Sequence, residues 1–151
     1  MVSNETATVD YTGQFSAAGG AKIEAGLAGS IERVVPLEWT LAQFDPKLPA
    51  VFSTPAMIWL MEITASHAIG AALPPGALTV GTRIEVDHLK AVPAGVTVVA
   101  KAVLVEVNGR RLIFDVEVIC GANVIGRGRV HRAIVEHSRF VAIAAEKPSN
   151  D

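Results

Sequence analysis

The stretch STPAMIWLMEITASHAIG, residues 53–70, has the length and the apolar composition of one buried helix. Thr54 is suited to cap its first turn, and Pro55 to the first helical position, where the missing N–H of proline costs nothing. The sequence LPPG at 73–76 ends the helix. No face of the helix is polar, so we expect other elements to wrap around it.

Glu62, in the middle of this helix, is out of place, because burying a charge is costly unless the charge is paired. With Ser66 and His67 it interrupts a segment that otherwise approaches the ~20 residues of a membrane span. We therefore predict a buried helix of a soluble domain. Glu62 is then either a structural carboxylate paired with a buried base or a functional group.

Strands surround the helix in the sequence. SIERVV at 30–35 precedes it, and alternating stretches follow at 79–90, 96–108, 110–120 and 124–137. Asn108-Gly109 and the GAN sequence at 121–123 indicate hairpins, and hence antiparallel order from Val96 onward. The predicted fold class is α+β, a long antiparallel sheet of five strands curled around one central hydrophobic helix. One sheet cannot cover a helix on every side, so we expect a second copy to complete the cover.

Composition favours one domain that forms an oligomer. The chain has 151 residues, of which 50% are hydrophobic and only 19% charged, more apolar than a typical monomer. We expect an N-terminal arm at 1–26, a domain at 27–140 and a C-terminal tail at 141–151. Cys120 is the only cysteine, so no internal disulfide forms, and the N-terminus does not resemble a secretory signal; we expect a cytoplasmic protein.

Charge limits the partners. The net charge of -2 argues against nucleic acid as a partner, and no membrane association is expected. Residues 83–139 nevertheless contain nine Lys or Arg against six Asp or Glu. This local excess suits a small phosphorylated ligand or, equally, a solvated strand face. The histidines lack the spacing of metal ligands, so no metal site is expected.

Three residues are candidates for chemistry: Thr54 at the helix start, Glu62 eight positions later, and His88 near the end of the next strand. His88 alternates with Ile84 and Val86, so we expect it to point toward the helix. Each also has a structural interpretation, as a cap, a paired carboxylate or a core histidine. We expect the three side chains to converge on one place.

The runs STPAMIWLMEITA, VGTRIEVDHLKAVPAG, NGRRLIFDVEV and IGRGRVHRAIV resemble the hot-dog fold thioesterases, in particular their fluoroacetyl-CoA thioesterase branch. The resemblance covers about residues 28–136. It implies a hot-dog fold that forms a homodimer, or a tetramer of paired dimers, with active sites between subunits. It implies an acyl-CoA substrate and no cofactor, CoA being part of the substrate. Thr54, Glu62 and His88 fall on the catalytic positions, and Gly81 and Arg132 on positions that contact the acyl group and the active-site network.

The resemblance predicts an acyl-CoA thioesterase that releases free CoA and a carboxylic acid. Glu62 would attack the thioester or activate water, His88 would polarise the site or move protons, and Thr54 would orient or share the nucleophilic step. Leu48 stands where that branch carries an aromatic residue, so the resemblance does not extend to fluoroacetate selectivity. The candidates for the CoA phosphates are not ranked by the sequence: Lys90, Arg110, Arg111, Arg127 and Arg129.

Two other functions fit the same fold. A hydratase or dehydratase would act on the double bond of an enoyl-CoA and leave the thioester intact. A non-catalytic module would bind an acyl-CoA without turnover.

Overall fold

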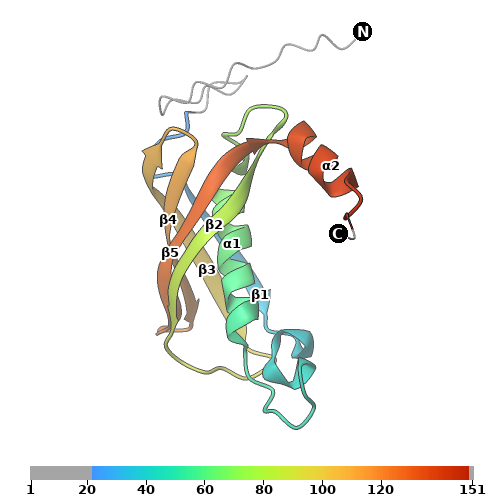
Figure 1. Ribbon diagram of the computed structural model, residues 1–151. Helices are drawn as coiled ribbons and strands as arrows, with labels where there is room; N and C mark the ends of the chain where they lie inside the picture. The colour runs from blue at the N-terminus through green and yellow to red at the C-terminus, as the bar shows by residue number, and fades with distance from the viewer. Residues whose placement is uncertain (1–21, 150–151) are drawn as a thin grey trace.

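A computed structural model describes residues 22–149 of the chain. Five strands form one antiparallel sheet in the order β1-β3-β4-β5-β2, which curls around helix α1 (Figure 1). The elements are β1 (Ala28–Val34), two 3-10 turns (Leu37–Trp39 and Leu41–Gln43), α1 (Thr54–Gly70), β2 (Ala77–His88), β3 (Thr97–Asn108), β4 (Arg111–Cys120), β5 (Asn123–Glu136) and α2 (His137–Ala145). The predicted α+β fold class is confirmed, with strand bounds within a few residues of the predicted ones.

The N-cap of helix α1 is Ser53, one residue before the predicted cap Thr54. Ser53 has the extended backbone of an N-cap residue, and its hydroxyl accepts a hydrogen bond from the Ala56 N–H at 3.3 Å. The prediction that Thr54 caps the helix is therefore wrong. The physical consequence is that the hydroxyl of Thr54, the first helical residue, is available for another role.

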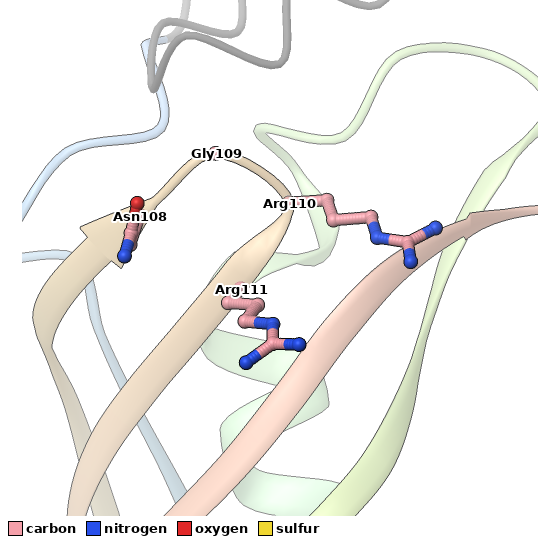
Figure 2. Close-up of a pocket in the computed structure, with 4 residues that line it drawn as sticks. All are labelled: Asn108, Gly109, Arg110 and Arg111. Carbon is pink, nitrogen blue, oxygen red and sulfur yellow. The ribbon is translucent and has the colours of Figure 1, made fainter.

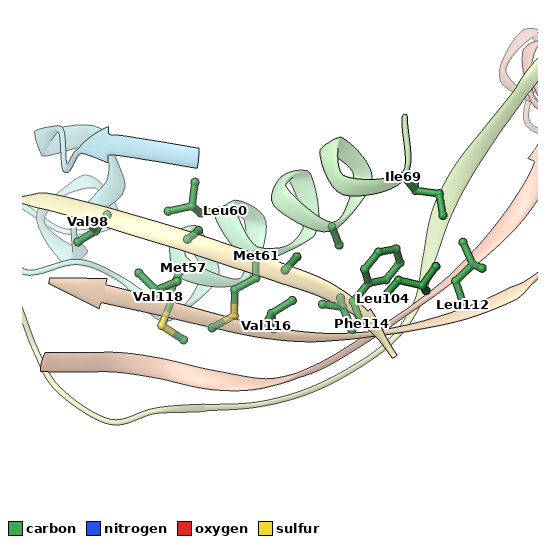
Figure 3. Packing of buried hydrophobic residues seen from close by; sticks show 14 of the residues in the cluster. Met57, Leu60, Met61, Ile69, Val98, Leu104, Leu112, Phe114, Val116 and Val118 are labelled. Carbon is green, nitrogen blue, oxygen red and sulfur yellow. The ribbon is translucent and has the colours of Figure 1, made fainter. Parts of the chain in front are cut away.

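The core lies between α1 and the concave face of the sheet. Figure 3 shows Met57 and Met61 of the helix beside Val118 and Val116 of β4, and all four are almost fully buried. The buried helix residues recur at the three- and four-residue spacing of one face. They are Met57, Leu60, Met61, Thr64, Ala65 and Ile69.

Among residues 22–149, little covers the opposite face of α1. Trp59 lies on it with 50% of its surface exposed, and Thr54 and Pro55 are also exposed. The helix is apolar on both sides, yet the sheet covers only one of them. Within residues 22–149, the expectation that other elements wrap α1 therefore holds for the face that packs against the sheet.

The β3–β4 hairpin is present where it was predicted, but its turn is shifted by one residue. Asn108 pairs with Arg111, so the two turn residues are Gly109 and Arg110. Gly109 has φ +59°, a conformation that suits glycine at the first position of a two-residue turn. As a result Arg110 lies at the tip of the hairpin and Arg111 begins β4.

A close approach of β1 to α1 depends on Gly29. A Cβ added at this glycine would lie 2.9 Å from both the N and the Cα of Ala68. Backbone atoms cannot move aside as a flexible side chain can. The absence of a side chain at Gly29 therefore allows the strand and the helix to pack at this separation.

The two ends of the domain differ from the expected boundaries. Residues 1–21 of the predicted arm lie outside the described residues, but Ile23 is 2% exposed and belongs to the core, and the Gly26 N–H bonds to Leu104 O at 2.8 Å. Helix α2 crosses the predicted boundary at 140 and was not expected. Between residues 22 and 149, every helix is too short or too polar to cross a membrane.

Candidate active site

Thr54 and His88 are hydrogen-bonded to each other. Thr54 Oγ1 lies 2.8 Å from His88 Nδ1, which brings the first turn of α1 to the last residue of β2. The imidazole packs edge-on against the ring of Phe52, with the centroids 6.2 Å apart. Its other nitrogen, Nε2, is buried and has no hydrogen-bond partner within residues 22–149. A hydroxyl and an imidazole at this separation can exchange a proton.

Glu62 is held by Arg132. The Arg132 Nη1 donates to Glu62 Oε1 at 3.1 Å, and the two side chains are 9% and 29% exposed. Burial lowers the pKa of the Arg132 guanidinium from its ordinary value, and the charge and hydrogen bond of Glu62 oppose this effect. Because an arginine remains protonated at neutral pH, the carboxylate faces a positive charge. Glu62 is therefore paired but still open to solvent.

Thr79 on β2 holds the other edge of the guanidinium. The Arg132 Nε donates to Thr79 Oγ1 and Nη2 donates to the Thr79 carbonyl oxygen, both at 2.9 Å. Thr79 and Arg132 are both buried. Each of the three guanidinium nitrogens thus donates one hydrogen bond, two of them to Thr79 on β2 and one to Glu62 on α1. This arrangement sets the position of the Glu62 carboxylate.

Gly81 lies directly against the same carboxylate. A Cβ added at Gly81 would come closer than 3.0 Å to both carboxylate oxygens of Glu62. Gly81 is also the cross-strand partner of Arg132, and the β2–β5 register shifts between Gly81 and Arg83. The glycine leaves the space that the carboxylate occupies.

Within one chain the five predicted site residues form two groups. Thr54 and His88 make one group, and Glu62, Gly81 and Arg132 make the other. Glu62 is eight residues beyond Thr54 in α1, a rise of about 12 Å along the helix axis at ~1.5 Å per residue. Within one chain the helix therefore separates Glu62 from Thr54 and His88, and the convergence of the three side chains, expected at a seam between subunits, stays a prediction.

Comparison with known proteins identifies the family. The family model described as fluoroacetyl-CoA-specific thioesterase matches residues 37–138. The chain belongs to this family. The fluoroacetyl-CoA thioesterase of Streptantibioticus cattleyicolor is 37% identical over 120 residues, which cover 76% of this chain and 86% of that protein.

Solved structures of a fluoroacetyl-CoA thioesterase and of a thioesterase superfamily member are similar to the chain. A structure of the fluoroacetyl-CoA thioesterase FlK has a TM-score of 0.77 at 34% identity, covering 83% of this chain and 98% of that one. A thioesterase superfamily member from Thermus thermophilus has a TM-score of 0.74 at 26% identity, covering 81% and 90%. The predicted hot-dog fold, the family and the enzyme class of thioester hydrolase are confirmed.

The group around Glu62 includes one residue that sequence reasoning missed. Thr79 is an ordinary strand residue in the sequence, and only the structure shows that it clamps Arg132. A usable signal was its spacing, because residues two apart on a strand share a face and Thr79 precedes Gly81 by two. Among residues 22–149 no three His, Cys, Asp or Glu side chains are grouped as metal ligands.

Proposed function

We propose that this member of the fluoroacetyl-CoA-specific thioesterase family hydrolyses an acyl-CoA thioester to free CoA and a carboxylic acid. The observation that carries the proposal is the state of Glu62. It is a carboxylate in the middle of an apolar helix, held by a buried arginine yet 29% exposed. A carboxylate that served only to pair with Arg132 would need no access to solvent.

Hydrolysis breaks the C–S bond of the thioester and forms a C–O bond to water. Glu62 either removes a proton from the attacking water or attacks the carbonyl carbon itself, with water then cleaving the mixed anhydride. The departing thiolate of CoA takes up a proton. His88 is the candidate carrier of this proton, and Thr54 orients the imidazole through the 2.8 Å contact. The Thr54 amide, at the positive end of α1, is the candidate donor to the developing oxyanion.

A homodimer is part of the proposal, because one chain keeps the two groups apart. Among residues 22–149, strand β2 is an edge of the sheet, and Trp59 on the apolar face of α1 is 50% exposed. A second copy that covers this edge and this face would bring its own Thr54 and His88 to the same seam. Sedimentation of the purified protein tests for the dimer, and it also tests whether two such dimers pair into a tetramer. A cytoplasmic location and the absence of nucleic-acid and membrane partners also belong to this proposal.

The decisive experiment measures free thiol released from a panel of acyl-CoAs. The panel runs from acetyl-CoA and fluoroacetyl-CoA to aromatic acyl-CoAs, since FlK is described as fluoroacetyl-CoA-specific and Leu48 departs from that branch. We expect thiol release with the wild type, and a loss of about 100-fold or more in Glu62→Gln with an unchanged circular dichroism spectrum. No thiol above background from any substrate would contradict the proposal.

Two other readouts separate the alternative functions. A hydratase would change the absorbance of an enoyl-CoA without releasing thiol. A binding module would give heat on titration with acyl-CoA but no product, and Glu62→Gln would then alter affinity alone.

A further inference from the structure

The tip of the β3–β4 hairpin carries two adjacent arginines over a pair of neighbouring cavities. Figure 2 shows Arg110 and Arg111 extending from the turn toward β5. One cavity, of about 510 Å³, is lined by Asn108–Arg111. The second, of about 550 Å³, shares Asn108, Arg110 and Arg111 and continues along the sheet to Thr82 and Arg83 of β2. We call the two together the hairpin groove.

The hairpin groove is cationic. Arg83, Arg110 and Arg111 line it together with His131, whereas Glu106 is its one acidic lining residue. Arg83 and His131 both contact Glu85. Within residues 22–149, Arg110 and Arg111 take part in none of the ion pairs. Two exposed guanidinium groups therefore remain free to bind an anion.

The other basic candidates are already matched with carboxylates or amides. Arg129 donates to Asp115 at 3.0 Å, and Arg127 lies between its cross-strand partners Glu117 and Asp87. The cavity of about 570 Å³ at this place is balanced, with three basic and three acidic lining residues: Lys101, Arg127, Arg129, Asp87, Asp115 and Glu117. Lys90 donates to Asn123 at 3.1 Å. None of these sites offers a net positive charge comparable with the hairpin groove.

The hairpin groove adjoins the residue that holds the proposed catalytic carboxylate, although Glu62 itself does not line it. Arg132 lines its larger cavity and at the same time donates to Glu62. The Ile134 N–H donates to Arg110 O at 2.8 Å, which fixes the hairpin to the strand that carries Arg132. An acyl-CoA places its thioester and its phosphates at opposite ends of the pantetheine arm. It therefore needs a cationic site that is connected to the reacting carboxylate but separate from it.

We propose that Arg110 and Arg111, in the hairpin groove, bind the phosphate groups of the CoA nucleotide. This inference rests on the proposed acyl-CoA function and names the residues that recognise the part of the substrate distant from the thioester. Phosphate oxygens accept charge-assisted hydrogen bonds from guanidinium groups, often in pairs. These phosphate contacts contribute to substrate binding alone, so we expect them to affect KM and not kcat.

The test compares two double variants on two substrates. Arg110→Ala/Arg111→Ala removes the proposed contacts, and Arg127→Ala/Arg129→Ala removes the same charge from the balanced cavity. Each is assayed with an acyl-CoA and with the corresponding acyl-pantetheine, which lacks the nucleotide phosphates. We expect the hairpin variant to raise KM for acyl-CoA about tenfold or more, with kcat unchanged and with KM for acyl-pantetheine unchanged. The control variant is expected to change KM by no more than about twofold for either substrate.

Every other outcome also either supports or overturns the assignment of Arg110 and Arg111. An equal rise in KM with both variants, a rise with acyl-pantetheine, or no rise at all would overturn the assignment. If the wild type hydrolyses neither substrate, the proposed function has failed, and calorimetric titration with CoA itself then tests the groove. Weaker CoA binding in the hairpin variant than in the control variant would still support the assignment, and equal binding would overturn it.

Discussion

The guanidinium of Arg132 on β5 reaches the carboxylate of Glu62 on α1 across 3.1 Å. The same guanidinium is bound on its other edge by Thr79 of β2, so three elements fix one carboxylate. Because these bonds use the planar fork of arginine, the position of Glu62 depends on the shape of the cation as well as on its charge.

Replacing Arg132 by lysine separates shape from charge. Arg132→Lys keeps the cation, but one ammonium group cannot bond Thr79 and Glu62 in the same geometry. We expect kcat/KM to fall by at least about tenfold, because a displaced catalytic group loses its productive orientation. We expect a loss of stability of about 1–3 kcal/mol from the unsatisfied Thr79 groups. Wild-type turnover in this variant would show that charge alone suffices.

Thr79 is expected to act as a positioning residue through Arg132. Thr79→Val keeps the side-chain shape but removes the acceptor of the Arg132 Nε, whereas Thr79→Ser keeps the hydroxyl and loses a methyl group. Both changes cost stability, so thermal unfolding does not separate them. The difference lies in kcat, which we expect to fall in the valine variant and to be largely retained in the serine variant. Equal kcat values in the two would contradict the role.

The absence of a side chain at Gly81 is expected to matter for turnover more than for stability. A Cβ in Gly81→Ala would occupy the space of the Glu62 carboxylate, the end of a flexible side chain that can swing away. We therefore expect a loss of turnover of about 100-fold with a small change in melting temperature. The matched control is Gly70→Ala, where a Cβ meets nothing within 4 Å. The control is expected to keep its activity and to be slightly stabilised.

The sequence was enough to predict the fold, because hydrophobic periodicity and turn residues are local. The alternation of Leu112, Phe114, Val116 and Val118 predicted their shared face, and all four are buried in the core. The resemblance to a known family added the proposed roles of Glu62 and Arg132, which periodicity could not assign. The alternation of β5 puts Arg132 on the same face as Val130 and Ile134, and all three are buried in the structure.

The features that the sequence could not predict depend on backbone geometry and on contacts between residues far apart in the sequence. Ser53 and Thr54 are adjacent residues that can each cap a helix, and only the backbone decides which of them does so. The spacing of eight between Thr54 and Glu62 suggested a common site, but helix rise separates them in one chain. The clamp formed by Thr79 joins positions 53 residues apart and leaves no local pattern.

The pair Ser53 and Thr54 allows stability and activity to be separated at one place. Ser53→Ala removes the hydroxyl that caps α1 and is expected to cost about 1 kcal/mol of stability without loss of kcat. Thr54→Val leaves the cap intact but removes the partner of His88, so we expect kcat to fall with little change in melting temperature. The measurements are thermal unfolding and thiol release on both variants. The opposite pattern would return the capping role to Thr54.

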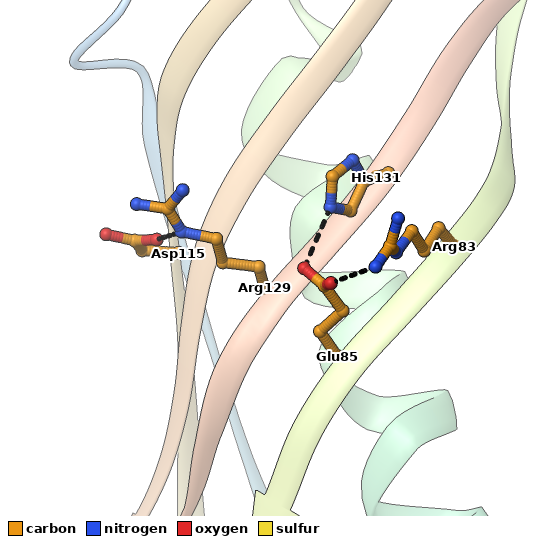
Figure 4. Close-up of polar contacts among 5 residues, drawn as sticks. All are labelled: Arg83, Glu85, Asp115, Arg129 and His131. Atoms are coloured by element: carbon orange, nitrogen blue, oxygen red, sulfur yellow. Dashed lines mark hydrogen bonds and ion pairs between the residues drawn. The ribbon is translucent and has the colours of Figure 1, made fainter.

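Glu85, on the outer face of the sheet, is expected to contribute to stability only above acidic pH. Figure 4 shows its carboxylate between His131 and Arg83. The hydrogen bond from His131 and the charge of Arg83 lower the pKa of Glu85 below its ordinary value of 4.5. A lowered carboxyl pKa means that the folded protein binds the proton less readily than the unfolded chain. The stabilisation is therefore fully present above the ordinary value and is lost as the pH falls through the lowered one.

The measurement for Glu85 is the melting temperature of the wild type and of Glu85→Gln as a function of pH. We expect the variant to melt at a slightly lower temperature at pH 7, because the carboxylate is exposed and its pairs are screened by water. The gap is expected to close as the pH falls well below 4.5, since both proteins then carry a neutral side chain at this position. About 1 M salt should also narrow the gap at pH 7, because exposed charges are then screened within ~3 Å. A gap that stays constant from neutral to strongly acidic pH would mean that the glutamine disturbs packing, and that the carboxylate charge contributes nothing.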